Sequence, residues 1–423
     1  MNEAVDIRPA PANAVAVSSR RASLLRSPLA VGGLILVLYA LWFGAYVLAG
    51  YTAHDMILIS KRYADQSHVS KVITYDPRHY RYTGNKTGYD GEFFYFIAAD
   101  PVNARYYVDD PPYRYTKILY PALARVLALG RVDLLPYTLL LINWLAAAGG
   151  TAIVAAWLIR RRLSPWLALI YGLYPGIFIG FQRDLTEPLS YALVALAVYL
   201  FDFGSARRIL LSAAVFALAV LTRDKSVIFP ALYAAGVLLR GVQYAVPAKR
   251  IRLIARNAWL AVPFFTIALA PLAFWKLFIW LWLRSVTVTQ EAGSVAPFQA
   301  VTMRDSMNAA TVLAIPTVVV PGLICAGMAL WALYRREWDV KVWTLLIVVT
   351  LGVVTLDPQF YRDLFSMLRV SAAVVLSAIY CIPVFDRLSG GHRKWLWASV
   401  AGWIPVPLAF SLFGPVYLMQ GHF

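Results

Sequence analysis

Residues 29–50 read LAVGGLILVLYALWFGAYVLAG, a run of 22 residues without a charged side chain. A helix needs about 20 predominantly apolar residues to cross the hydrocarbon core of a bilayer, so this stretch predicts a membrane-spanning helix. Ten further apolar segments follow it, at residues 134–159, 163–182, 188–203, 209–222, 226–239, 258–283, 309–334, 342–356, 370–385 and 395–420. The sequence therefore predicts an all-α polytopic membrane protein with about eleven transmembrane helices.

The composition of the 423-residue chain agrees with this class of protein. Hydrophobic residues make up 60% of it, charged residues only 14%, and the mean hydropathy is +0.63. Soluble domains carry roughly 25% charged residues. A soluble enzyme, a disordered scaffold and a disulfide-linked scaffold are therefore excluded, and the two cysteines, Cys325 and Cys381, both lie in apolar segments.

The basic residues predict the orientation of the chain. Residues 1–28 form a Pro-, Ala- and Ser-rich tail that we expect to be disordered and cytoplasmic, followed by a single transmembrane domain at residues 29–423. With this orientation, the cytoplasmic segments hold 20 of the 39 Lys and Arg residues and few of the 22 acids, as the positive-inside rule requires. The net charge of +17 is thus mostly a topology signal, and no nucleic-acid partner is predicted.

The outward segment between the first two spans, residues 51–133, is unusually long. Its 83 residues include 9 acids, 11 Lys and Arg residues and 15 Phe and Tyr residues. A structureless loop of this length is uncommon in a compact domain. Residues 91–99 (GEFFYFIAA) and 116–130 (TKILYPALARVLALG) place apolar side chains beside charged ones. We expect both to be interfacial helices, lying along the membrane surface and covering a site there.

The sequence GYDGEFFY at residues 88–95 is the first candidate for chemistry. A carboxylate at Asp90, next to glycine, can be approached closely by a sugar, and the aromatic side chains offer stacking faces. Alternatively, Asp90 only caps the helix that we expect to begin at Gly91, because Asp is a favoured residue at that position.

Arg-Asp pairs recur at the predicted outward ends of spans. The four pairs are Arg183-Asp184, Arg223-Asp224, Arg304-Asp305 and Arg362-Asp363. Ion pairing and snorkelling at the interface explain any one of them. The further cations at the same predicted level are Arg114, Lys117, Lys225 and Arg369. Together these groups are compatible with a cationic pocket for a lipid-linked phosphate, since Arg suits bidentate phosphate contact.

The stretch YRYTKILYP at residues 113–121 alternates Tyr with Lys and Arg. It is compatible with phosphate or sugar binding and equally with an aromatic belt at the bilayer surface. The five histidines show no metal-ligand spacing, and a solvated turn explains Asp109-Asp110 before two prolines. No metal site is predicted.

At these residues the chain resembles a known family. The segments GYDGEFFYFIAADP (88–101), YRYTKILYPALA (113–124), RDLTEPLSYALVALA (183–197) and LTRDKSVIFP (221–230) are similar to segments of bacterial polytopic proteins of cell-surface glycopolymer formation. Those proteins belong to the GT-C glycosyltransferase superfamily. The likeness covers the first half of the chain, and the first motif commonly reads YDGQ in the family where this chain has Glu92.

The resemblance implies a GT-C-like fold in the bacterial plasma (inner) membrane with an extracytoplasmic active site. It implies inverting transfer of a sugar from a polyprenyl-phosphate donor to a cell-envelope glycan or glycolipid. The catalytic carboxylate of the first loop is then Asp90, which we expect to accept the proton of the acceptor hydroxyl. The cations expected to stabilise the departing phosphate are Lys117, Arg183, Arg223, Lys225 and Arg362. The other expected substrate contacts are Tyr89, Glu92, Arg114, Tyr115, Asp184 and Glu187. We expect Glu187 to orient Arg183 or to touch a sugar hydroxyl. No cofactor is expected, and a divalent metal only if the donor is a pyrophosphate.

Two other classes of protein remain compatible with the sequence. One is a polytopic lipid or sugar transporter (a flippase), which would place ionisable residues near the bilayer midplane and show related halves. In this chain only Lys276 lies well within a predicted span. The other is a non-catalytic cell-envelope assembly protein, which would explain the long loop but not the concentration of phosphate-compatible groups.

Overall fold

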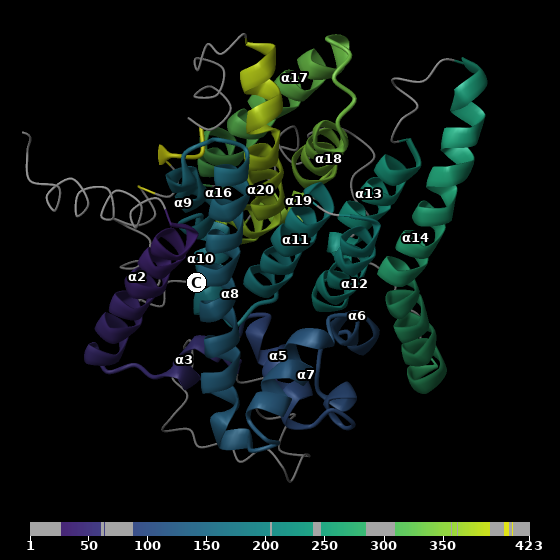
Figure 1. Cartoon of the computed structure of the whole chain (residues 1–423). Coiled ribbons are helices and arrows are strands. Elements are labelled where there is room, and N and C mark those ends of the chain that lie inside the picture. The colour runs from purple at the N-terminus through teal and green to yellow at the C-terminus, as the bar shows by residue number, and fades with distance from the viewer. Residues whose placement is uncertain are drawn as a thin grey trace, which may run out of the picture.

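The computed structural model describes residues 27–60, 63, 88–203, 205–239, 247–284, 309–356, 358–361, 363–389, 402–405 and 408. Every regular element in these ranges is a helix (Figure 1). Five helices are long and apolar enough to cross a membrane: Pro28–Leu48, Val132–Arg160, Ala258–Leu283, Thr311–Tyr334 and Leu364–Leu388. The protein is thus an α-helical membrane protein, as its composition predicts.

The described elements run in the following order: α2 (Pro28–Leu48), α3 (Ala53–Ile57), α5 (Gly91–Ala99), η1 (Ala104–Tyr106), α6 (Pro111–Tyr115), α7 (Leu119–Leu127), η2 (Val132–Leu134), α8 (Leu135–Arg160), η3 (Pro165–Ala168), α9 (Leu169–Gly172), α10 (Pro175–Gln182), α11 (Glu187–Asp202), α12 (Ala206–Thr222), η4 (Asp224–Val227), α13 (Ile228–Leu239), α14 (Pro247–Leu283), α16 (Ala309–Ala314), η6 (Ile315–Val319), α17 (Val320–Tyr334), α18 (Val340–Val349), η7 (Thr350–Val354), α19 (Pro358–Tyr361) and α20 (Leu364–Leu388). The elements η6 and η7 are π-helical turns, and the other η elements are 3-10 turns.

The first span shows how the sequence builds these elements. Ser27 caps α2 by accepting a hydrogen bond from the Leu29 N–H, and Pro28 occupies the first turn, where its missing N–H costs nothing. The helix packs on α8. A Cβ atom at Gly32 would lie 2.7 Å from the Ala148 carbonyl oxygen, so glycine is what lets the two backbones approach.

The expected single span at residues 163–182 is divided by the structure into η3, α9 and α10. Tyr174 has an extended backbone immediately before Pro175. Proline disfavours a helical conformation in the residue before it and cannot continue the hydrogen-bond ladder, so a new helix starts there. All eight residues of α10 are buried. Two parts of the prediction lie almost wholly outside the described residues: the expected segment at 395–420 and the tail up to residue 26.

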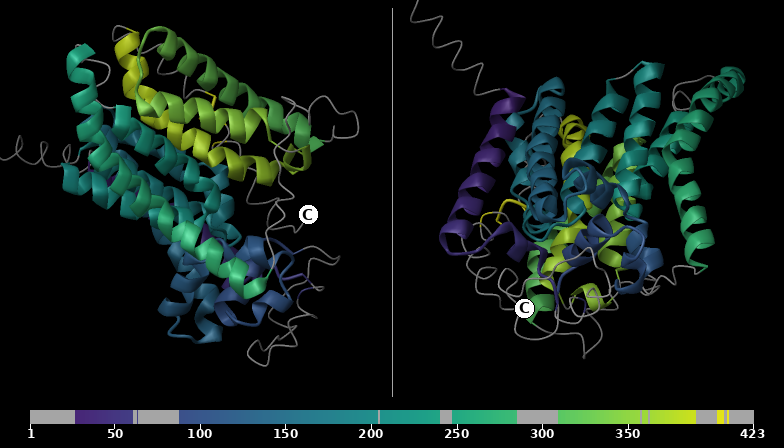
Figure 2. Two further views of the ribbon diagram at one scale, coloured as in Figure 1. Left: turned by 90° about the vertical axis from the view of Figure 1, so that its right-hand side faces the viewer. Right: turned by 90° about the horizontal axis from the view of Figure 1, so that it is seen from below.

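The helices between the first two long apolar helices pack beneath one end of the bundle, as Figures 1 and 2 show. Helix α5 has the expected bounds, and α7 lies within the expected range 116–130. The position of both helices along the membrane surface stays a prediction, and all nine residues of α5 are buried within the protein. Since GEFFYFIAA lacks a charged face, burial on every side costs little, and aromatic contacts such as Phe94 on Tyr120 hold it in place.

Candidate active site

Asp90 lies immediately before α5, at the junction with the helix bundle. Among the described residues its side chain makes no capping hydrogen bond, so the interpretation of Asp90 as a simple cap is wrong. The first residue of α5 explains the placement. A Cβ atom at Gly91 would lie 2.2 Å from the Arg183 carbonyl oxygen, so only glycine lets α5 start against the segment that follows α10.

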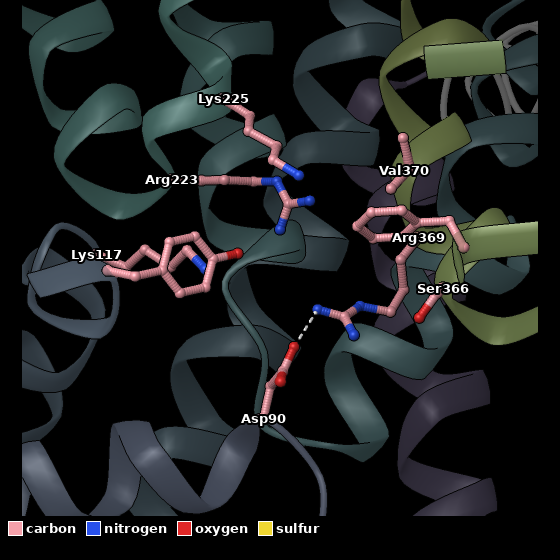
Figure 3. Close-up of a pocket in the computed structure, with 9 residues that line it drawn as sticks. Asp90, Lys117, Arg223, Lys225, Ser366, Arg369 and Val370 are labelled. Carbon is pink, nitrogen blue, oxygen red and sulfur yellow. Dashed lines mark hydrogen bonds and ion pairs between the residues drawn. The ribbon is translucent and has the colours of Figure 1, made fainter. Parts of the chain in front are cut away.

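Two arginines hold the Asp90 carboxylate. Its Oδ1 atom lies 3.0 Å from Nη1 of Arg114, and its Oδ2 atom lies 3.0 Å from Nη2 of Arg369, an ion pair drawn in Figure 3. Burial of Asp90 favours its neutral form, but the charges of Arg114, Arg369 and Lys117 outweigh this effect and hold the pKa of Asp90 well below its usual range. The carboxylate is therefore firmly ionised and weakly basic while these pairs persist.

Both arginines are themselves fixed by further partners. Arg114 donates from Nε and Nη2 to the two oxygens of Asp109, each at 2.7 Å. Arg369 donates from Nε to Oε1 of Glu187 at 2.8 Å and from Nη1 to the Tyr89 hydroxyl at 3.1 Å. Every guanidinium nitrogen of the two residues is thus already a donor within the protein.

The carboxylate of Glu187 joins the bundle side of this network. Its Oε1 atom accepts from Nη1 of Arg223 at 2.7 Å as well as from Arg369. Glu187 begins α11, Arg223 follows α12 and Arg369 lies in α20, so one buried carboxylate ties three helices together. Sequence reasoning expected Glu187 to orient Arg183; the structure gives it Arg223 and Arg369 as partners.

A cavity of about 270 Å³, here called the inner cleft, lies beside Asp90. Its lining residues are Asp90, Tyr113, Lys117, Arg223, Lys225, Phe360, Ser366, Arg369 and Val370. Figure 3 shows Lys117, Arg223 and Lys225 on one wall, with Arg369 and Ser366 opposite. The Nζ atom of Lys117 lies 3.6 Å from the centre of the Tyr113 ring. Burial, together with the charge of Arg114, lowers the pKa of Lys117 to about 7. Such a cationic wall can bind an anion.

An apolar groove of about 270 Å³ continues from the inner cleft into the bundle. The two cavities share Arg223, Lys225, Phe360 and Val370. The groove runs between α13, the π-helical turn η7 and α20, and its further lining includes Ile228, Phe229, Leu351, Gly352, Leu356 and Ala373. An anionic head group and an apolar chain can therefore be held side by side.

A second cavity of about 340 Å³, here called the outer cleft, also has Asp90 in its lining. It shares Asp90, Ser366 and Arg369 with the inner cleft. Its other lining residues are Tyr63, Gly88, Tyr89, Glu92, Phe93, Asp109 and Arg114. Asp90 therefore lines both cavities.

The structure brings most of the expected site residues together. Lys117, Arg223 and Lys225 line the inner cleft, and Tyr89, Glu92 and Arg114 line the outer one. Arg183 and Asp184 are buried beside the start of α5 and line neither cleft. Tyr115 also lines neither; its hydroxyl donates to the Pro101 carbonyl, and its ring packs on Trp282 of α14. Arg362, like the Arg304-Asp305 pair, lies outside the described residues.

The acids of two Arg-Asp pairs serve local structure. Asp363 caps α20 by accepting from the N–H groups of Phe365 and Ser366, and Asp224 accepts from the Lys225 N–H. Sequence reasoning included Arg369 in the cationic set without a specific role and missed Ser366 altogether. Ser366 follows the capping residue Asp363 by three positions, and Arg369 follows Ser366 by three. This spacing places both side chains on one face of α20 and is the sequence signal that could have identified them.

Comparison with known proteins gives no matching family model, no similar curated protein and no similar solved structure. Within the described part of the chain, no three His, Cys, Asp or Glu side chains converge as metal ligands would.

Proposed function

We propose that the protein is an inverting GT-C-type glycosyltransferase of the bacterial plasma membrane. It would transfer a sugar from a polyprenyl-phosphate donor to a cell-envelope glycan or glycolipid on the extracytoplasmic side, within an arrangement of about eleven spans and a cytoplasmic N-terminus. The observation that carries this proposal is the position of Asp90 between two clefts, of which one is cationic and continuous with an apolar groove.

The donor fits the inner cleft and the groove by its chemistry. A polyprenyl-phosphate sugar combines an anionic phosphate with a long apolar chain, so it needs cations next to an apolar channel. Lys117, Arg223 and Lys225 supply the cations, and the groove between α13 and α20 begins at two of them. Positive groups placed in advance stabilise charge that develops on the departing phosphate.

In the proposed reaction, a hydroxyl of the acceptor enters from the outer cleft. Its oxygen attacks the anomeric carbon of the sugar, and Asp90 takes the hydroxyl proton as the new carbon–oxygen bond forms. The bond between the anomeric carbon and the phosphate oxygen breaks, and its electron pair leaves with the polyprenyl phosphate. Attack from the side opposite the phosphate inverts the anomeric configuration. General-base assistance of this kind contributes about 10²- to 10⁴-fold in rate.

The arginine pairs of Asp90 bear directly on this role. A phosphate bound in the inner cleft adds negative charge beside Arg369, Lys117 and Arg223. It thereby offsets the field that holds the pKa of Asp90 down, and the carboxylate becomes a stronger base. The donor would thus activate the base, and Asp90 would be weakly basic in its absence.

The location of the clefts favours an enzyme over a transporter. The lining residues of the inner cleft come from the residue before α5, from α6 and the turn after it, from the turn after α12, from α19 and from the start of α20, at one end of the bundle. A transporter holds its substrate near the bilayer midplane.

The test is a sugar-transfer assay with the purified full-length chain in lipid nanodiscs. Synthetic polyprenyl-phosphate sugars serve as donors and short glycans as acceptors, and NMR reads the anomeric configuration of the product. We expect a new glycosidic bond with inverted configuration. Transbilayer movement of the donor without transfer would instead identify a transporter. The absence of both activities across the whole donor panel would contradict the proposal.

A further inference from the structure

The outer cleft differs from the inner cleft in its charge balance. Asp90 and Asp109 face Arg114 and Arg369 in it, and all three nitrogens of each guanidinium already donate to protein groups. Among the described lining residues, both arginine charges are thus paired with carboxylates, so neither is left uncompensated for an anion. Its remaining polar group of interest is Glu92, which is only 2% exposed.

We propose that the outer cleft is the acceptor site, that it takes the uncharged, hydroxyl-bearing end of a glycan, and that Glu92 is the residue that recognises this end. The inference rests on the proposed function and adds to it the location and charge class of the acceptor and a specificity-determining residue.

The geometry around Glu92 supports this assignment. Its Oε2 atom accepts from the Ser60 N–H at 2.8 Å and from the Ser60 hydroxyl at 3.0 Å, which fixes the orientation of the carboxyl group. A Cβ atom at Gly88 would lie 2.4 Å from Oε1. Glycine at this lining position therefore leaves room for the Glu92 carboxyl group, which itself lines the outer cleft.

The charge state of Glu92 suits an uncharged partner. Burial raises the pKa of Glu92 to about 8, against the hydrogen bonds from Ser60 and the charge of Arg114. The other ionisable groups that line this cleft are Asp90, Tyr89, Asp109, Arg114, Arg369 and Tyr63. Below pH 8 the carboxyl group keeps its proton, so it can donate a hydrogen bond to a sugar hydroxyl without adding charge. An anionic acceptor would lose its hydration here and would meet only arginines that are already paired with carboxylates.

The position relative to Asp90 is also that of an acceptor. The outer cleft meets the inner cleft at Asp90, Ser366 and Arg369, which line both. Glu92 follows Asp90 by two residues. A hydroxyl bound beside Glu92 would therefore lie near the proposed base, with the donor in the adjoining inner cleft.

The experiment measures binding of small glycosides to the full-length protein in nanodiscs by saturation-transfer NMR. The panel contains the methyl glycosides of glucose, galactose, mannose and rhamnose, with methyl glucuronide as the anionic and methyl glucosaminide as the cationic counterpart. We expect at least one neutral glycoside to bind about tenfold more tightly than both charged ones at pH 6.5. Binding of the glucuronide as tightly as any neutral glycoside, or of no neutral glycoside at all, would overturn the inference.

Variants of Glu92 assign the contact. Glu92→Ala should weaken the neutral glycoside by about tenfold, the size of one net hydrogen bond. Glu92→Gln, an uncharged isostere that can keep the Ser60 contacts, should bind within about twofold of the wild type at pH 6.5. As pH rises through 8, the wild type should lose affinity while Glu92→Gln stays constant. An unchanged Glu92→Ala variant, or identical pH profiles, would contradict the role of Glu92.

Two controls separate this inference from the proposed function. Asp133→Asn changes an exposed carboxylate of the same outward segment and should leave every glycoside unaffected. Binding of vesicles that contain polyprenyl phosphate reports on the inner cleft. If the Glu92 variants fail the prediction while lipid-phosphate binding remains and depends on Lys117, only the acceptor inference falls. If lipid-phosphate binding does not depend on Lys117, the proposed donor site falls instead.

Discussion

At the scale of single residues, the central feature is a carboxylate that its surroundings make a weak base. Asp90 is paired with Arg114 and Arg369 at 3.0 Å each, yet it is the one acid shared by both clefts. Arg114 is paired with Asp90 and Asp109, and Arg369 with Asp90 and Glu187. The proposed donor phosphate is therefore assigned to the wall formed by Lys117, Arg223 and Lys225. Some basic residues thus pair with Asp90 and others are proposed to bind the donor phosphate, and this difference is the basis of the first prediction.

Lys117 should make binding of the lipid donor depend on pH. Its pKa is about 7, so the amine is charged below pH 7 and loses its charge as pH rises through that value. A phosphodiester donor keeps its single negative charge throughout, so affinity should be highest below pH 7 and fall above it. A bound anion stabilises the charged amine and moves the midpoint upward.

The variant Lys117→Arg stays charged and should give a flat profile, whereas Lys117→Ala should bind weakly at every pH. Donor binding from pH 5.5 to 9 measures this, with Lys276→Ala on the exposed side of α14 as the control. A flat wild-type profile would contradict the assigned charge of Lys117.

At the scale of secondary-structure elements, the position of α5 sets the position of Asp90. The Gly91 Cβ position lies 2.2 Å from a backbone oxygen, which cannot move as a flexible side chain would. Gly91→Ala should therefore displace α5, lower the melting temperature and reduce sugar transfer at least tenfold.

The matched control is Gly149→Ala in α8, where a Cβ atom meets nothing within 4 Å. Alanine is the better helix former, so this variant should be as stable as the wild type or more stable. Thermal unfolding and the transfer assay check both variants. Equal behaviour of the two would show that the close approach at Gly91 does not position the site.

The comparison of sequence and structure differs between elements. The bounds of α2, α8 and α5 follow from apolar runs and from Pro and Gly at their ends, and these were predictable. The burial of α5 was not, because a run without a polar face fits the membrane surface and the protein interior equally well. The proline at position 175 predicts a helix break after Tyr174. The sequence prediction missed this break because it averaged hydropathy over the whole segment at residues 163–182.

The same division holds for the site. Asp90 and the cations Lys117, Arg223 and Lys225 were identified from residue type and local motif. The ion-pair partners of Glu187 and Arg114 could not be identified in this way, because they depend on tertiary contacts. The contact between Glu187 and Arg369 joins residues 182 positions apart, and nothing in the local sequence specifies it.

At the scale of the whole molecule, ionic networks hold the bundle at both ends. At the end opposite the clefts, Asp202 accepts from Trp157 at 2.9 Å and from Arg161 at 2.8 Å, and pairs with Lys341 at 3.0 Å. These residues join the ends of α8 and α11 to the start of α18 (Figure 1). This network is structural, whereas the network at Glu187 lies beside the clefts.

Asp202→Asn should therefore lower stability and leave the site intact. Breaking a buried ion pair from one side costs about 3 kcal/mol, because the partner charges stay buried. We expect a lower melting temperature with donor binding within about twofold of the wild type. Asp133→Asn breaks an exposed pair with Arg131 and should not change the melting temperature. Loss of donor binding in a still-folded Asp202→Asn protein would show that the two ends are coupled.

The most direct test of the account is turnover by Asp90→Asn, with donor binding measured separately on the same protein. Asparagine keeps the size of the side chain but cannot accept the hydroxyl proton. It also removes the negative charge that competes with the donor phosphate for Arg369. We predict that single-turnover sugar transfer falls about 10²- to 10⁴-fold while the donor binds as tightly as to the wild type or more tightly. Turnover at the wild-type rate would contradict the central claim that Asp90 is the base.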